Sequence, residues 1–234
     1  MLKPENDSMG HAITDYYETG SAGNLFVYSD ICETDEIPVP YMFRTFKEMP
    51  TLEQKALNLC HGEVLDVGAA AGAHSLWLQN NGINTSAIDI SRLSVNIMKK
   101  RGIKNVHCCN INTLSADKKY DTLLLLMNGT GLAGTLDNLS MFLKQCSSLL
   151  KSGGQILIDS SDLIYLFDSL DEIPKDYYYG EVEYQIVYKD IISKSFNWLF
   201  VDYNRLKLTA ENNGMKCSRI MDSKNFHYLA RIIL

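Results

Sequence analysis

A short loop rich in glycine and alanine is the part of the sequence best suited to hold a ligand. An apolar run ends at Asp66, and Gly68, Ala70 and Gly72 follow it at alternate positions. Gly68 can adopt a positive φ, and without a Cβ atom it lets a ligand lie against the backbone. The helical pattern that begins near Gly72 would present unpaired N–H groups and a partial positive charge. The loop is therefore expected to hold a polar, elongated molecule.

A dinucleotide is one candidate for this loop. Dinucleotide-binding loops have the pattern G-x-G-x-x-G and place a pyrophosphate on the helix N-terminus. Here Gly72 comes one residue too early, and the methyl group of Ala70 would crowd a pyrophosphate. The loop also opens with the acid Asp66, where a dinucleotide site usually has a small apolar residue. An NAD-dependent oxidoreductase is therefore the less favoured alternative.

The spacing Asp66-x-Gly68-x-Ala70-x-Gly72 resembles the first motif of the class I S-adenosylmethionine-dependent methyltransferases, acidic-x-Gly-x-Gly-x-Gly, with Ala70 in place of the middle glycine. The resemblance runs from about residue 60 to residue 160 and implies S-adenosyl-L-methionine as the cofactor. It also implies methyl transfer to a small-molecule acceptor by in-line displacement. No histidine stands out as a general base, so no catalytic residue is assigned and a non-catalytic cofactor-binding module stays an alternative. No metal site is expected.

The resemblance assigns the cofactor contacts to residues at the ends of successive strands. Asp89 would accept hydrogen bonds from both ribose hydroxyls, and Ile90 would lie on the adenine face. Asn110 would contact the adenine amino group, and the backbone carbonyl of Met127 would lie near the ammonium of the methionine moiety. The full set assigned to the cofactor is Arg44, Asp66, Gly68, Ala69, Ala70, Asp89, Ile90, Asn110, Ile111 and Met127.

Several of these residues also have ordinary structural explanations. Arg44 precedes the loop, where some small-molecule methyltransferases bind the cofactor carboxylate with an arginine that donates two parallel hydrogen bonds; it could equally be a surface arginine. Asp89 could instead favour a helix N-terminus through its charge, and Asn110 could be a turn residue. His74 is expected to be a residue of the first helical turn rather than a ligand.

The acceptor side carries weaker signals. Asn128 follows the fourth strand, where nucleic-acid adenine methylases have Asn/Asp-Pro-Pro-aromatic; here Gly129 and Thr130 replace the prolines, which argues against base methylation. Asp159 and Ser160 follow the fifth strand and would line the acceptor pocket, or would simply cap the next helix. Tyr17 is expected to belong to a flap over the site. The candidate acceptor residues are Tyr17, Asn128, Asp159 and Ser160.

The elements that must position these residues alternate between strand and helix from residue 63 to residue 160. The predicted strands are 63–68, 84–89, 104–109, 120–127 and 155–159, and the predicted helices are 73–81, 91–101 and 136–151. Gly153-Gly154 is expected to end the last helix. Alternating strands and helices at this spacing form βαβ units and hence an α/β, doubly wound parallel sheet. The resemblance implies a seven-stranded, mostly parallel Rossmann-like sheet with an antiparallel C-terminal strand.

The flanking segments complete a single domain over residues 1–234. Residues 175–201 alternate aromatic and polar side chains, which predicts an inserted β-hairpin with one aromatic face. A helix over 202–213 and two closing strands over 215–221 and 226–233 follow. Residues 1–50 are expected to be an irregular cap or flap over the cofactor-binding core, residues 60–160.

Composition narrows the class of partner. The chain has 234 residues and a net charge of −6, and no basic cluster larger than Lys99-Lys100-Arg101, so a nucleic-acid partner is not expected. No apolar segment resembles a signal peptide or membrane span. The six cysteines lack C-x-x-C spacing and are expected to be reduced, as in a cytoplasmic protein. A monomer or a homodimer is expected.

Overall fold

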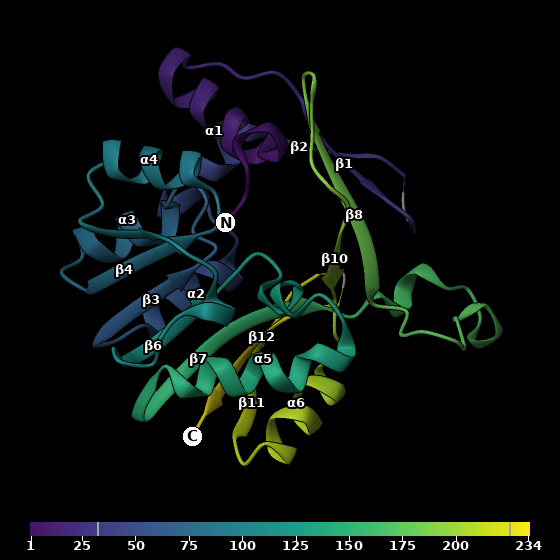
Figure 1. Cartoon of the computed structure of the whole chain (residues 1–234). Coiled ribbons are helices and arrows are strands. Elements are labelled where there is room, and N and C mark those ends of the chain that lie inside the picture. Colours follow the sequence, from purple (N-terminus) through teal and green to yellow (C-terminus); the bar gives the residue numbers. More distant parts are fainter. Residues whose placement is uncertain (32, 225) are drawn as a thin grey trace.

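The larger of the two sheets of this protein has seven strands, in the order β11-β12-β7-β6-β3-β4-β5 (Figure 1). The computed structural model describes residues 1–31, 33–224 and 226–234. The strands are β3 (Glu63–Val67), β4 (Asn84–Asp89), β5 (Asn105–Cys108), β6 (Tyr120–Leu125), β7 (Leu150–Ser161), β11 (Lys216–Asp222) and β12 (His227–Ile233). Strands β3 to β7 are parallel, and β12 is antiparallel to both of its neighbours. The predicted seven-stranded, mostly parallel sheet is confirmed.

Helices cover both faces of this sheet (Figure 1). They are α2 (Thr51–Leu59), α3 (Ala73–Asn80), α4 (Arg92–Lys100), α5 (Leu136–Ser148) and α6 (Tyr203–Asn212). Leu123 of β6 packs with α5 and α6, whereas the next residue, Leu124, packs with α2 and α3. Both leucines are fully buried, as expected for a central strand that is covered on both faces.

Side-chain caps and glycines set most helix boundaries where the sequence predicts them. The Ser91 hydroxyl accepts a hydrogen bond from the Ser94 N–H at the start of α4, and Asp202 caps α6 in the same way. The end of α5 is different. This helix stops at Ser148, and Gly153-Gly154 lie inside β7 instead of ending the helix. The register of β6 and β7 shifts here, and Gly153 has a φ of +76°. The glycines therefore allow an irregularity in the pairing of the two strands.

The second sheet joins the N-terminal segment to the predicted hairpin. Its order is β10-β8-β1-β2, and β9 pairs with β8. The strands are β1 (Leu25–Ser29), β2 (Asp35–Ile37), β8 (Glu181–Tyr188), β9 (Ile191–Ile192) and β10 (Phe196–Leu199). The expected aromatic hairpin is present, with the Tyr184 ring edge-on to the rings of Phe196 and Phe200. The prediction that residues 1–50 are irregular is wrong, because β1 pairs with the distant β8 along its whole length.

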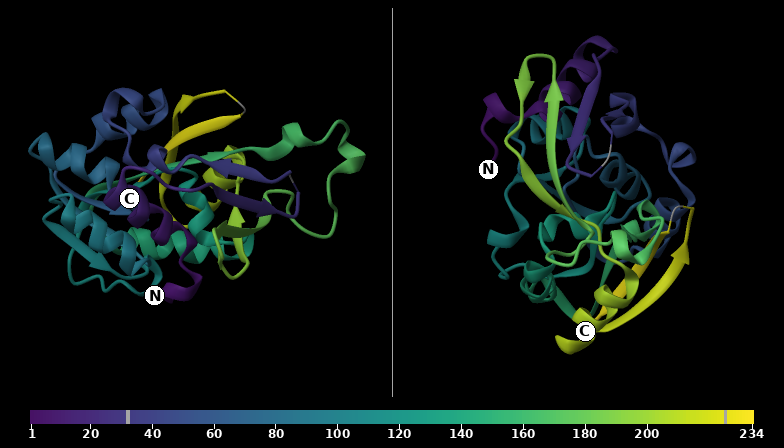
Figure 2. Two further views of the ribbon diagram at one scale, coloured as in Figure 1. Left: turned by 90° about the horizontal axis from the view of Figure 1, so that it is seen from above. Right: turned by 90° about the vertical axis from the view of Figure 1, so that its right-hand side faces the viewer.

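The N-terminal segment covers α4 and the glycine-rich loop that follows β3. Helix α1 (Ser8–Thr19) lies over α4, and β1 lies beside β8 (Figures 1 and 2). The 3₁₀ helices are η1 (Pro4–Asn6), η2 (Val39–Phe43), η3 (Phe46–Glu48), η4 (Ile111–Thr113), η5 (Gly129–Ala133), η6 (Leu163–Leu166) and η7 (Leu170–Glu172). Ile13 of α1 and Met42 of η2 pack against Ala71 of the glycine-rich loop and Ile97 of α4. Residues from the first fifty thus pack directly against the glycine-rich loop.

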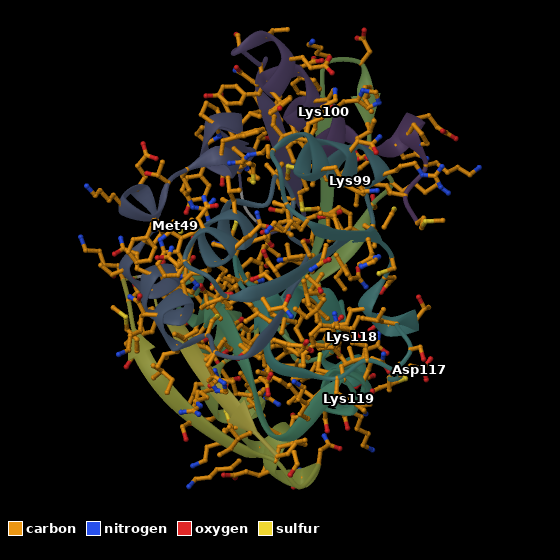
Figure 3. The ribbon with its side chains drawn as sticks, turned by 90° about the vertical axis from the view of Figure 1, so that its left-hand side faces the viewer. Met49, Lys99, Lys100, Asp117, Lys118 and Lys119 are labelled. Atoms are coloured by element: carbon orange, nitrogen blue, oxygen red, sulfur yellow. The ribbon has the colours of Figure 1, made fainter. Side chains whose placement is uncertain are left out.

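The basic residues do not gather on one element. Lys99 and Lys100 end α4, whereas Lys118 and Lys119 lie in a different part of the molecule, in the loop before β6 (Figure 3). Lys100 also pairs with Glu18 of α1 at 2.8 Å.

The other composition-based expectations concern cysteines and membrane spans. Five cysteines (Cys60, Cys108, Cys109, Cys146 and Cys217) are free thiols, and Cys32 lies outside the described residues. Among the described helices, none has the length and apolar character that crossing a membrane would require.

Candidate functional site

Most of the predicted site residues lie at one edge of the main sheet. Strands β3 to β7 are parallel, so their carboxyl ends meet at this edge, which is where open α/β sheets bind ligands.

The glycine-rich loop between β3 and α3 is shaped for a ligand at its start and for close packing at its end. A Cβ atom at Gly68, whose φ is +71°, would meet nothing within 4 Å, so this position is open. A Cβ atom at Gly72 would instead collide with the Cδ1 atom of Ile103. Ala70 adopts a φ of +50°, a conformation that costs a non-glycine residue about 1–3 kcal/mol. The loop is therefore held in a strained form by its surroundings.

Asp89 at the end of β4 is hydrogen-bonded to this loop. Its two carboxylate oxygens accept hydrogen bonds from the Ala70 N–H at 2.9 Å and the Ser91 N–H at 2.8 Å. Burial raises the pKa of Asp89 to about 6, opposed by these two hydrogen bonds and assisted by the nearby Asp7 and Asp66. The next residue, Ile90, leaves 41% of its surface exposed. A carboxylate and an apolar side chain thus lie together beside the loop.

The N-terminal segment also reaches Asp89 and its neighbours. The Ser91 hydroxyl donates to the buried carboxylate of Asp7 at 2.5 Å, and the Leu2 N–H donates to the Ile90 carbonyl at 3.0 Å. Asp7 in turn caps α1. An acid buried in this way gives no sequence signal, and Asp7 is not among the residues predicted from the sequence.

Asn110 and Ile111 follow the next strand, β5. Asn110 is exposed, and its side-chain oxygen accepts a hydrogen bond from the Asn112 N–H at 2.9 Å, so it caps η4. The Ile111 side chain is buried and packs with Leu65 and Val67. Both residues follow β5, the neighbour of the strand β4 that ends at Asp89.

The turn after β6 differs from the prediction for Met127. The strand ends at Leu125, and Met127 and Asn128 form a turn in which φ is +66° and +62°. Two consecutive non-glycine residues in the left-handed region are strained, and such strain collects at functional sites. Met127 is more than one-third exposed, so the turn presents it at the sheet edge.

Asn128 and Ser160 are buried beneath this turn. Ser160 donates to the Asn128 side-chain oxygen at 2.8 Å and accepts from the Val201 N–H at 3.0 Å. The Asn128 amide donates to the Leu199 carbonyl at 3.2 Å, and Thr130 joins the same network. These side chains therefore link the end of β6 to the segment after β10. A direct contact of either side chain with an acceptor stays a prediction.

Asp159 of β7 is also fully buried beside the turn. One carboxylate oxygen accepts from the Gly129 N–H at 2.9 Å, and the other lies 2.9 Å from Nε2 of His227.

Arg44 is buried, which excludes the surface arginine considered above. Its Nε and Nη2 atoms donate to one Glu53 oxygen at 3.2 and 2.5 Å. The same oxygen lies 2.8 Å from Nε2 of His74. Burial acts to raise the pKa of Glu53, but the hydrogen bond and charge of His74, together with Arg44, outweigh it and hold the pKa below its usual value. His74 is thus part of a buried ionic cluster with Arg44 and Glu53.

Asp66 of β3 and Tyr41 of η2 lie near this cluster. Asp66 accepts a hydrogen bond from the Ser75 hydroxyl at 2.6 Å, and burial raises its pKa. The Tyr41 hydroxyl donates to Glu53 at 3.3 Å. Burial and then the charge of Glu53 raise the pKa of Tyr41, and Asp159 adds to this effect. Tyr41 therefore lies near carboxylates from both sides of the site.

Tyr17 lies outside this group of residues. Its hydroxyl donates to the Lys100 carbonyl at the last turn of α4, whereas Asp89 precedes the first turn. A helix of this length puts about 13 Å between the two ends.

Comparisons with known proteins agree with this geometry. A sequence family described as a methyltransferase domain matches residues 65–158. The crystal structure of an S-adenosylmethionine-dependent methyltransferase from Bacteroides fragilis, in complex with S-adenosyl-L-homocysteine, is 44% identical to the chain. The match covers 100% of this chain and 97% of that chain, with a TM-score of 0.93.

More distant structures share the fold. An S-adenosylmethionine-dependent methyltransferase from Clostridium acetobutylicum is 15% identical, with a TM-score of 0.61 over 80% of this chain and 93% of that chain. CalS10, an amino pentose methyltransferase from Micromonospora echinaspora, is 12% identical, with a TM-score of 0.54 over 80% of this chain and 92% of that chain. A search of curated proteins found no match.

Proposed function

The chain belongs to the S-adenosylmethionine-dependent methyltransferases, and from this premise we propose that it transfers the methyl group to a small-molecule acceptor by in-line displacement. The family and the cofactor predicted from the loop are confirmed, and the dinucleotide alternative is set aside. The cofactor supplies a methyl group on a positively charged sulfur, which is already a good leaving group. The protein must then align the acceptor and exclude water.

The residues at the sheet edge fit this cofactor. The open position at Gly68 leaves room for a ligand against the backbone. We assign the ribose to Asp89, and the adenine to Ile90, Asn110 and the backbone of Ile111. The strained loop and the Met127 turn then lie at the methionine end of the cofactor, and Arg44 and Asp66 support the charged groups of that end.

One observation supports a small acceptor more than a macromolecule: other parts of the chain cover the edge where the methyl group would lie. Trp198 of β10 packs so closely on η5 that a Cβ atom at Gly131 would collide with its indole ring. On the other side, Ile13 and Met42 pack onto the glycine-rich loop. A covered edge of this kind admits a small molecule more readily than a folded chain. The amino pentose substrate of CalS10, which shares only the fold, is an acceptor of that size.

Two measurements test the proposal. S-adenosylhomocysteine at 100 times its Kd should stabilise the protein by about 2.7 kcal/mol, which raises the Tm by about 5–11 °C, whereas NAD should not. Cofactor with a labelled methyl group is then incubated with a cell extract, with and without the protein. Protein-dependent label should appear in the dialysable fraction. Label found only in protein or nucleic acid would contradict the small-molecule proposal.

Arg44→Lys should weaken binding of S-adenosylhomocysteine about tenfold. Arg44 spreads its donors over three nitrogens, with Nε and Nη2 on Glu53 and Nη1 on the Tyr41 carbonyl. Lysine keeps the charge but carries its three donors on one nitrogen, so it should bind Glu53 and a ligand together less well. Isothermal titration calorimetry measures the change, with Lys207→Ala on α6 as the control. An unchanged Kd combined with slower methyl transfer would instead place Arg44 on the acceptor side.

The affinity for S-adenosylhomocysteine should fall as the pH is lowered through about 6. Ribose hydroxyls donate to an ionised carboxylate, and the pKa of Asp89 is raised to about 6, so below that pH the ligand must displace a proton. The Kd should be about tenfold higher at pH 5 than at pH 8. In Asp89→Asn this dependence should disappear. A wild-type Kd that is constant from pH 8 to pH 5 would contradict the ribose assignment.

A further inference from the structure

His227 and the buried Asp159 form a pair that neither the family motif nor the cofactor assignment uses. His227 is the first residue of β12 and pairs with Ser161 in register, so Asp159 is its diagonal neighbour on β7. Alternate residues of a strand share a face, and Leu157 and Leu229 place this face against α2 and α3. Nε2 of His227 lies 2.9 Å from a carboxylate oxygen of Asp159.

The structure holds the carboxylate of Asp159 in place. Its side chain is 1% exposed, and the oxygen that does not contact His227 accepts a hydrogen bond from the Gly129 N–H at 2.9 Å. Gly129 directly follows the strained turn of Met127 and Asn128. One hydrogen bond therefore separates the pair from the turn that we place at the methionine end of the cofactor.

The imidazole of His227 is oriented by this carboxylate and is still accessible, with 32% of its side chain exposed. An ionised carboxylate only accepts hydrogen bonds, so it selects the tautomer in which Nε2 carries the proton. Nδ1 then keeps its lone pair. A histidine held in this way by a carboxylate is the usual arrangement of a general base.

We propose that His227 is the general base of the methyl transfer and that Asp159 is its positioning residue, an inference that rests on the proposed function. As an O–H or N–H acceptor forms its bond to the methyl carbon, the carbon–sulfur bond breaks and its electron pair goes to sulfur. The acceptor proton passes to Nδ1 of His227. The Asp159 carboxylate stabilises the imidazolium, which then releases the proton to solvent through its exposed side.

The surroundings of the pair are consistent with this role. Burial and, to a smaller extent, the charge of Asp159 raise the pKa of two described tyrosines, Tyr41 of η2 and the buried Tyr228 of β12. The Arg44–Glu53–His74 cluster lies next to Tyr41. The members of the cluster are hydrogen-bonded to one another, and His74 is buried and bound to Glu53. Among the residues that the structure describes, His227 is therefore the one histidine at this edge that combines a carboxylate partner with a partly exposed side chain.

The main test compares His227→Gln with His61→Gln, in which an exposed histidine at the opposite, amino-terminal end of β3 is changed. For the acceptor fraction that the wild type labels, His227→Gln should lower the transfer rate on the order of 10²–10⁴-fold. The Kd for S-adenosylhomocysteine, measured by calorimetry, should stay within about twofold. A rate within about threefold of that of His61→Gln would overturn the proposal.

A second readout does not depend on finding an acceptor. Nitrogen-15 NMR of the histidine rings should show His227 in the Nε2–H tautomer, and Asp159→Asn should shift the ring toward a mixture of the two tautomers. An unchanged tautomer in Asp159→Asn would show that Asp159 does not position the ring. If no acceptor fraction is labelled, the proposed function fails, and the NMR result still decides whether the pair exists as described.

Discussion

Replacing Glu53 by alanine is expected to lower the free energy of unfolding by about 3–5 kcal/mol, because it leaves a buried guanidinium without its carboxylate. Arg44 makes two hydrogen bonds to Glu53, and His74 makes a third. Arg44 and Glu53 are both almost fully buried, so water cannot replace the lost partner. For a chain of this length the Tm should fall by about 6–20 °C.

Urea denaturation of the purified variant measures this change. Asn58→Ala, an exposed position on the same helix α2, is the control and should change stability by less than about 0.5 kcal/mol. Glu53→Gln keeps the shape of the side chain, so its loss of unfolding free energy should lie between those of Glu53→Ala and Asn58→Ala. A loss below about 1 kcal/mol in Glu53→Ala would mean that Arg44 reaches solvent or another acceptor.

Asp89→Ala is expected to raise the Kd for S-adenosylhomocysteine about 10- to 150-fold, which corresponds to about 1.5–3 kcal/mol for hydrogen bonds to a charged group. The variant removes the proposed ribose acceptor and also releases the Ala70 N–H, so the strained loop loses a support. Calorimetry at pH 8 measures the change, where the wild-type carboxylate is ionised.

The control for Asp89→Ala is Asp190→Ala, which removes an exposed acid from the turn between β8 and β9. It should leave the Kd unchanged. An Asp89→Ala variant that binds as tightly as Asp190→Ala would show that Asp89 serves only the loop and the helix N-terminus.

The central elements could be predicted because their signals are local. Ser91 caps α4 by accepting a hydrogen bond from Ser94, three residues later. Gly82 and Gly102 follow α3 and α4 in left-handed conformations. Leu123 and Leu124 belong to a run that only a strand covered on both faces would carry. Each of these features needs only a few adjacent residues.

The missed elements depend on distant partners. Strand β1 forms because Leu25 pairs with Tyr188 and Ser29 with Tyr184, and no pattern within residues 1–50 encodes that pairing. The sequence predicts a strand that runs to Met127, whereas the structure has a turn there, because left-handed φ angles of non-glycine residues are imposed by the surrounding structure.

In the site too, some residues can be identified from the sequence alone, whereas others can be identified only from their contacts in the structure. Arg44, Asp66 and Asp89 stand out by type and position. Glu53 and His227 do not, because a buried carboxylate in a helix and a histidine at the start of a strand are common. Only their distances to His74 and Asp159 distinguish them.

The pairing of β1 with β8 has a consequence for the order in which the protein is completed during synthesis. At ribosomal rates of about 5–20 residues per second, β1 leaves the ribosome roughly 8–30 s before β8 does. Until then β1 lacks the strand beside it, and such distant pairings form slowly. The cover over the cofactor loop includes α1, which packs on both β1 and β8. The parallel strands β3 to β7 are therefore made before β8, whereas α6, β11 and β12 of the main sheet follow it. The binding site is covered only when most of the chain has been made.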